Sequence, residues 1–170
     1  SGLEAMRAAI EALPEGASAG PHAEPALALL GAKLAKLKDF RHSHAKVMKA
    51  LLDLVVAIAA KSTAEAPFPR KLLKHIVPAA VDKLSDKKVA ESSGAALTAL
   101  SEAVAPAPVT VLVLAQLSKA KIPAVLAGGL GFLGTCASEF GVKAMADSAG
   151  KTVVAHAKSS GGLSHSNATV

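Results

Sequence analysis

The clearest candidate for chemistry in this sequence is the hexapeptide GLGFLG at residues 129–134. It matches G-x-G-x-x-G, a pattern whose glycines let a backbone turn approach the pyrophosphate of a dinucleotide. A dinucleotide fold also needs a strand on either side and an acidic residue about 20 positions on, at the end of the second strand. Asp147 has the required spacing, but it lies within a stretch that reads as a helix, VKAMADSAGK. We therefore expect the glycines to serve helix packing, with Gly128, Gly131 and Gly134 on one helical face.

No other group of residues indicates catalysis or metal binding. The histidines are scattered; only His42 and His44 lie close together, with no cysteine nearby. Glu91 and Glu102 are about three turns apart on one expected helix, too far to act as an acid/base pair. The single cysteine, Cys136, excludes a disulfide framework. The sequence thus predicts a protein that is not an enzyme and has no cofactor and no metal site.

The amino-acid composition indicates which fold class and which kind of partner to expect. The 170 residues are 51% hydrophobic but only 2% aromatic, and a core of small side chains favours closely packed helices over sheets. The net charge of +6 favours an acidic partner. No lysine-rich block or aromatic platform indicates nucleic acid. The longest uncharged stretch, 122–138, is short for a membrane span, and the N-terminus does not read as a signal peptide. We expect a cytoplasmic protein that binds neither nucleic acid nor membrane.

Helical segments alternate with short polar breaks along the whole chain. Helices are expected at 3–13, 22–38, 46–61, 70–84, 89–104, 109–117, 124–140 and 142–158. Pro78 predicts a kink, Ser85 or Asp86 a helix cap, and Pro123 and Gly141 a helix start and end. The segment VTVLVLAQL at 109–117 has the composition of a strand, and only its place in the series predicts a helix.

The breaks repeat. Four polar turns each lead into a valine, at Val47, Val89, Val125 and Val170, with spacings of 42, 36 and 45 residues. A period of about 40 residues with two helices per unit is typical of HEAT-repeat α-solenoids. The sequence therefore predicts an all-α solenoid of antiparallel helix pairs. Residues 1–170 form a single domain of about four units in this interpretation, truncated at both ends.

Basic residues gather in successive turns of this repeat. Turns are generally polar and lysine is common, so the lysines could simply be solvated. However, turns within successive units of a solenoid project along one edge, where their lysines would form a stripe. The residues concerned are Lys38, Arg41 and Lys46 in or beside the first turn, Lys87 and Lys88 at the second, and Lys119 and Lys121 at the third.

These turns and the helices after them resemble a TOG domain, the HEAT-repeat tubulin-binding module of the ch-TOG/Dis/Mor microtubule polymerases. HAKVMKALLDLVVAIAAK (44–61), VDKLSDKKVAESSGAALTALSEAVAP (81–106) and LGFLGTCASEFG (130–141) are similar to the family's pattern of turn, valine and amphipathic helix. SEFG at the end of a repeat and SNATV at the C-terminus are most like the third module of the animal polymerases. Residues 1–39 match loosely.

The resemblance implies a non-enzymatic module that binds αβ-tubulin, free or in the microtubule lattice, through its intra-repeat turns. It also implies sister TOG modules in a longer chain and a cytoskeletal location at microtubules, the spindle or a microtubule-organising centre. The implied tubulin-binding residues are Arg41, His42, Lys46, Lys87, Lys88, Lys119, Lys121 and Asn167. The family's first turn usually presents a tryptophan, whereas this sequence has none. The alternative is a HEAT-repeat scaffold for a protein partner other than tubulin.

Overall fold

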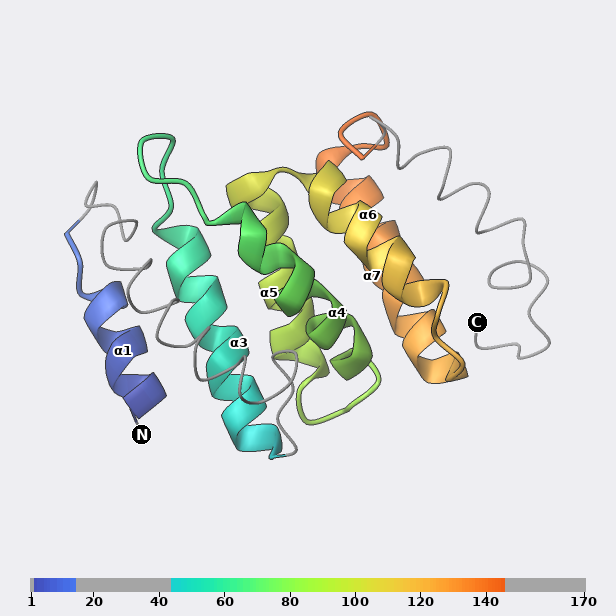
Figure 1. The fold of residues 1–170 in the computed structure, drawn as a ribbon, viewed down its shortest axis with the longest axis horizontal. Coiled ribbons are helices and arrows are strands. Elements are labelled where there is room, and N and C mark those ends of the chain that lie inside the picture. Colours follow the sequence, from blue (N-terminus) through green and yellow to red (C-terminus); the bar gives the residue numbers. More distant parts are fainter. Residues whose placement is uncertain (1, 15–43, 146–170) are drawn as a thin grey trace.

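A computed structural model of the chain describes residues 2–14 and 44–145, and within these ranges it is entirely helical (Figure 1). The elements are α1 (Gly2–Glu11), α3 (Ala45–Ala60), the 3-10 turn η1 (Arg70–Leu72), α4 (Leu73–Lys83), α5 (Ala90–Val104), α6 (Pro106–Leu117) and α7 (Pro123–Phe140). The described residues contain no strand. This confirms the predicted all-α class.

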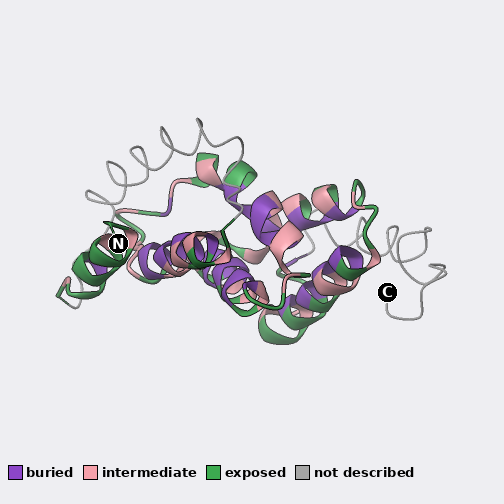
Figure 2. Cartoon of the chain, turned by 90° about the horizontal axis from the view of Figure 1, so that it is seen from below, coloured by how far each residue is buried: buried purple, intermediate pink, exposed green. Residues whose placement is uncertain are grey.

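The helices lie in two layers. Helices α1, α3 and α5 pack side by side in sequence order, and α4 packs on α6 in front of them in Figure 1. Helix α5 also contacts α4 and α6, while α7 packs against both helices of the front layer. Figure 2 views the molecule from the lower edge of Figure 1 and shows buried residues where the layers face each other.

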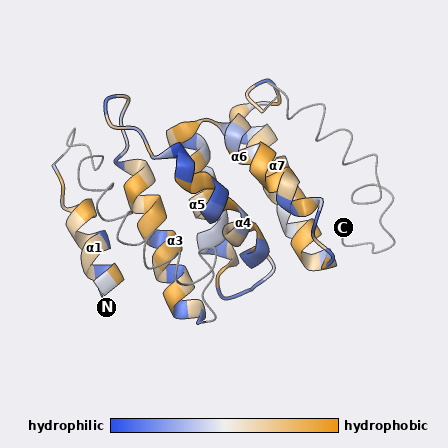
Figure 3. Ribbon diagram, viewed as in Figure 1, coloured by the Kyte–Doolittle hydropathy of each residue, from blue (hydrophilic) through white to orange (hydrophobic). Residues whose placement is uncertain are grey.

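The core is built from aliphatic side chains of both layers, as the composition predicts. Figure 3 shows these hydrophobic positions along each helix, whereas the turn between α4 and α5 is hydrophilic. The described side chains with less than 2% exposure include Phe68, Met48, Leu52, Leu54, Ile58, Ile76, Leu97, Leu100, Leu117, Val55, Val77 and Val81. One continuous cluster therefore joins residues from α3 through α6.

Helix α6 shows how tertiary context overrides local preference. Its valines favour strand, yet residues 106–117 are helical and bury Val109, Val113 and Leu117 against neighbouring elements. Pro106 occupies the first helical position, where a missing N–H costs no hydrogen bond. The Thr110 hydroxyl donates to the Pro106 carbonyl (2.9 Å), so this buried polar group is satisfied within the helix. The helix predicted from its place in the series is thus confirmed.

Two predicted boundaries change. The break expected at 105–108 shrinks to Ala105, because both prolines fit the first turn of α6. Residues 142–145 form a turn, so the helix expected from 142 does not begin there. Pro78 lies inside α4. Pro123 begins α7 and Gly141 ends it with φ +79°, as the sequence predicts. The helix expected at 22–38 and most of that at 142–158 lie outside the described residues.

The glycines of α7 divide into two pairs. A Cβ added at Gly128 would lie 2.8 Å from Leu84 Cβ, and one at Gly129 would collide with the Leu117 side chain. Gly131 and Gly134 are exposed, and a Cβ at either meets nothing within 4 Å. The expectation of close packing is therefore wrong for Gly131 and Gly134. The face of α7 that packs against its neighbours carries Gly128 and Gly129, not all three of the glycines that are spaced three residues apart.

Candidate protein-binding edge

The turn between α4 and α5 holds two exposed lysines on a fixed backbone. The Asp86 carbonyl accepts from the N–H groups of Val89 (2.8 Å) and Ala90 (2.7 Å), and its Oδ1 accepts from the Lys88 N–H (3.1 Å). Asp86 thus orders this turn through local hydrogen bonds. The helix cap predicted at Ser85 or Asp86 is wrong, because the residue that precedes α5 is Val89, and it forms no side-chain capping bond. Lys87 and Lys88 are exposed.

The turn between α6 and α7 is built in the same way from local backbone bonds. The Lys119 N–H donates to Gln116 O (3.1 Å) and the Ala120 N–H to Leu117 O (3.0 Å), which closes the end of α6. Lys119 and Lys121 are both exposed. The exposed lysines therefore stand on a backbone that is held by the helices on either side.

The first turn is described only where it enters α3. Lys46 is exposed in the first turn of that helix, and the His44 carbonyl accepts from the Met48 N–H (3.0 Å). The other implied tubulin-binding residues of this turn and of the last one, Arg41, His42 and Asn167, lie outside the described residues.

All three turns lie on one side of the molecule. Helices α3, α5 and α7 each begin at the lower edge in Figure 1, where the α4–α5 and α6–α7 turns also lie. We call this side the basic edge and define it by Lys46, Lys87, Lys88, Lys119 and Lys121. Within the described ranges, none of these lysines forms an ion pair with a carboxylate. Two acidic residues lie nearby: Asp86, whose Oδ2 is 3.8 Å from Lys83 Nζ, and Glu91, which is exposed in the first turn of α5.

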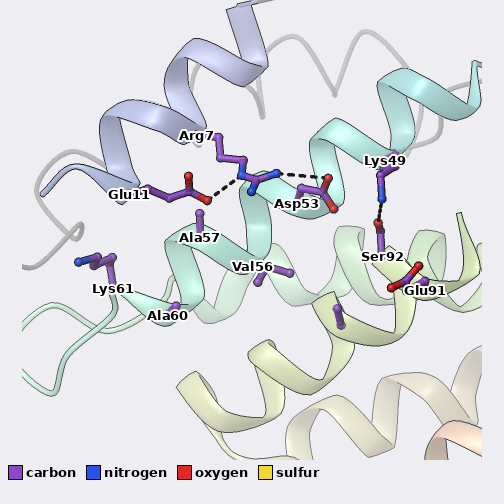
Figure 4. A pocket seen from close by; sticks show the side chains of 11 residues that line it. Arg7, Glu11, Lys49, Asp53, Val56, Ala57, Ala60, Lys61, Glu91 and Ser92 are labelled. Carbon is purple, nitrogen blue, oxygen red and sulfur yellow. Dashed lines mark hydrogen bonds and ion pairs between the residues drawn. The ribbon is translucent and has the colours of Figure 1, made fainter.

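A separate groove of about 440 Å³ lies where α1, α3 and α5 meet (Figure 4). Arg7 crosses from α1 to reach Asp53 (3.6 Å) and also bonds Glu11 (2.7 Å). The hydrogen bond with Glu11, together with the charge of that carboxylate, raises the pKa of Arg7. Lys49 Nζ donates to Ser92 Oγ (3.1 Å) between α3 and α5. These contacts join elements far apart in sequence, and no sequence pattern indicated them.

Lys61 lines the same groove just after the C-terminal end of α3. Its ammonium donates to the carbonyl of Leu13 at 3.1 Å, which ties the chain after α1 to the end of α3. The groove carries cations and carboxylates in similar number, among them Lys49, Lys61, Glu11 and Glu91. Its polar groups thus serve mainly to hold the three helices together.

The described residues that could act in catalysis or metal binding are dispersed. Within residues 2–14 and 44–145, no three His, Cys, Asp or Glu side chains gather as metal ligands would. Cys136 is buried in α7, and burial raises the pKa of its thiol, which disfavours the reactive thiolate. The GLGFLG hexapeptide lies inside α7 and follows a turn rather than a strand. The geometry around it therefore lacks the strand-turn-helix arrangement of a dinucleotide site.

Two further findings concern membrane spans and similarity to known proteins. None of the described helices is both long enough and apolar enough to cross a membrane. Comparisons of the chain with known protein families, with curated proteins and with solved structures found no match.

Proposed function

We propose that this chain is a TOG-like HEAT-repeat module that binds αβ-tubulin through its basic edge. Helices α4 with α5 and α6 with α7 are the antiparallel pairs of two units in this interpretation, and α3 is the second helix of the unit before them. The resemblance of residues 44–61, 81–106 and 130–141 to TOG repeats supports the family assignment.

The observation that carries the proposal is the alignment of the basic turns. Five exposed lysines lie on three turns along one edge, and the valines that follow these turns are 42 and 36 residues apart in the sequence. Like charges gathered on one edge repel each other, and an acidic surface relieves this repulsion while speeding encounter. Tubulin is the acidic partner that the resemblance implies.

The test is binding of the 170-residue chain to purified αβ-tubulin, by size-exclusion chromatography and by co-sedimentation with microtubules, in low and high salt. The main variants are two double charge reversals, Lys87→Glu with Lys88→Glu, and Lys119→Glu with Lys121→Glu. An exposed ion pair contributes about 0.2–1 kcal/mol, so each double variant is expected to weaken binding by about two- to thirtyfold. The effect decreases at high salt, where charges are screened beyond a few ångströms.

The matched control is the double reversal Lys74→Glu with Lys143→Glu. It changes the net charge by the same amount, at exposed positions near the edge opposite the basic edge. Lys61 is unsuitable as a control because it bonds to Leu13. If no tubulin binding occurs at low salt, or if the control weakens binding as much as the edge variants, the tubulin proposal is wrong. A scaffold for another acidic protein then becomes the better interpretation.

A further inference from the structure

An exposed apolar side chain lies among the lysines of the basic edge. Ile122, in the α6–α7 turn, is 60% exposed. The other large apolar side chains of the described residues that are exposed, Val111 on α6 and Val142 after α7, lie away from the turns that define this edge. Single exposed apolar residues are common on proteins, so the position and the support of Ile122 decide its meaning.

The backbone of Ile122 is held at the start of helix α7. Its carbonyl accepts from the N–H groups of Val125 (3.0 Å) and Leu126 (3.2 Å), which begins helix α7. Pro123 follows and disfavours the helical conformation for Ile122, whose φ of −94° and ψ of 116° are extended. The β-branched side chain has restricted χ1 freedom. Ile122 therefore presents its apolar surface with little conformational entropy left to lose on binding.

The surroundings of Ile122 indicate what kind of surface it fits. Lys121 precedes it and Lys119 lies three positions before it, both exposed. An apolar contact flanked by cations complements a protein surface where acidic residues surround a small apolar depression, as in interfaces with an apolar centre and a polar rim. Nucleic acid fits less well, because phosphates match the lysines but leave the isoleucine without an apolar contact.

We propose that Ile122 is the apolar anchor of the basic edge and inserts into an apolar depression on the acidic tubulin surface. The identity of that partner rests on the proposed function. The lysines supply screened, long-range attraction, whereas Ile122 supplies contact that is short-range and insensitive to salt.

The experiment measures the affinity of the 170-residue chain for αβ-tubulin at about 50 and 200 mM salt. Ile122→Ala is expected to weaken binding about five- to thirtyfold, by the same factor at both salt concentrations. Ile122→Leu restores most of the affinity. Lys119→Ala and Lys121→Ala instead lose more affinity at low salt than at high salt. Val142→Ala, which truncates a comparably exposed residue away from the basic edge, is the control and leaves the affinity unchanged.

The outcomes separate this proposal from the function on which it rests. If tubulin binds and the lysine variants weaken it, but Ile122→Ala does not, the anchor is refuted and the proposed function stands. Absence of tubulin binding at low salt refutes both. Ile122-dependent binding to phosphatidylserine vesicles in place of tubulin would also overturn the anchor, because the isoleucine would then insert into lipid. Melting curves of all variants should coincide, since exposed side chains contribute little to folding.

Discussion

Two glycines of α7, three residues apart, are expected to respond differently to alanine, and only Gly131→Ala is expected to stabilise the protein. Gly128 faces Leu84 at the end of α4, where an added Cβ would lie 2.8 Å from Leu84 Cβ and 3.4 Å from the Leu84 carbonyl carbon and oxygen. These atoms belong to the backbone or are attached directly to it, so no rotamer change removes them. Gly131 is exposed, and an added Cβ there meets nothing within 4 Å.

The magnitude follows from two contributions. Replacing glycine by alanine inside a helix stabilises it by about 1 kcal/mol, and both variants share this gain. Only Gly128→Ala must also separate α7 from Leu84, by about 0.6 Å to go from 2.8 Å to the 3.4 Å of ordinary contact. Overpacking of this kind costs about 1–3 kcal/mol. Gly131→Ala should therefore raise the free energy of unfolding by about 1 kcal/mol, and Gly128→Ala should leave it about 1–3 kcal/mol lower than Gly131→Ala.

Urea unfolding of the 170-residue chain, followed by circular dichroism at 222 nm, measures both values. Unchanged m-values would show that midpoint shifts report stability. If both variants stabilise the protein by the same amount, α7 does not approach Leu84 closely and the packing described for Gly128 is wrong. The same samples test the nucleotide interpretation of the hexapeptide: NAD or ATP should leave the melting temperature unchanged, and a rise would indicate a binding site.

Two further predictions concern backbone strain and the cysteine. Ala105 joins α5 to α6 with φ +132° and ψ 152°, a conformation largely confined to glycine. Ala105→Gly should therefore raise the free energy of unfolding by about 1 kcal/mol in the same urea assay. A decrease would show that the backbone at Ala105 is not strained. Burial raises the pKa of the Cys136 thiol in the folded state, so its contribution to stability is complete below the unfolded pKa of about 8.5 and is lost as the pH rises above that value. Stability measured between pH 7 and 10 should therefore fall more steeply for the native chain than for Cys136→Ala, and parallel curves would contradict this.

Much of the secondary structure could be predicted from the sequence because its signals are local. Pro123 and Gly141 bound α7 through their own backbone preferences, and Asp86 orders the α4–α5 turn through hydrogen bonds to residues within four positions. The helix at 109–117 was predictable only from its place in the series of helical segments, since its valines favour strand by themselves. The alternation of helical segments and polar breaks thus predicted a helix where the local composition predicted a strand.

The basic edge was predictable for a topological reason. Antiparallel helix pairs of similar length return the chain to the same side at each turn, so residues about 40 positions apart come to one edge. The lysines of the 84–89 and 118–122 turns needed no knowledge of side-chain contacts to be placed there. The spacing of the polar turns in the sequence led to this prediction, because it indicates where helices α3, α5 and α7 begin.

The tertiary structure alone decided which side chains meet and which stay exposed. Gly128 packs and Gly131 does not because the contacts of α7 with α4 and α6 fix how the helix is rotated about its axis. The three-residue spacing of the glycines in the sequence does not reveal this rotation. The link from Lys49 to Ser92 spans 43 residues, and its geometry depends on how α3 lies against α5. Ile122 is exposed for the same reason: a turn residue before proline packs inward or outward according to the neighbouring layer, and here no described helix covers it. Local sequence thus determined the helices and their ends, whereas the rotation and distance of each helix relative to its neighbours determined the surface.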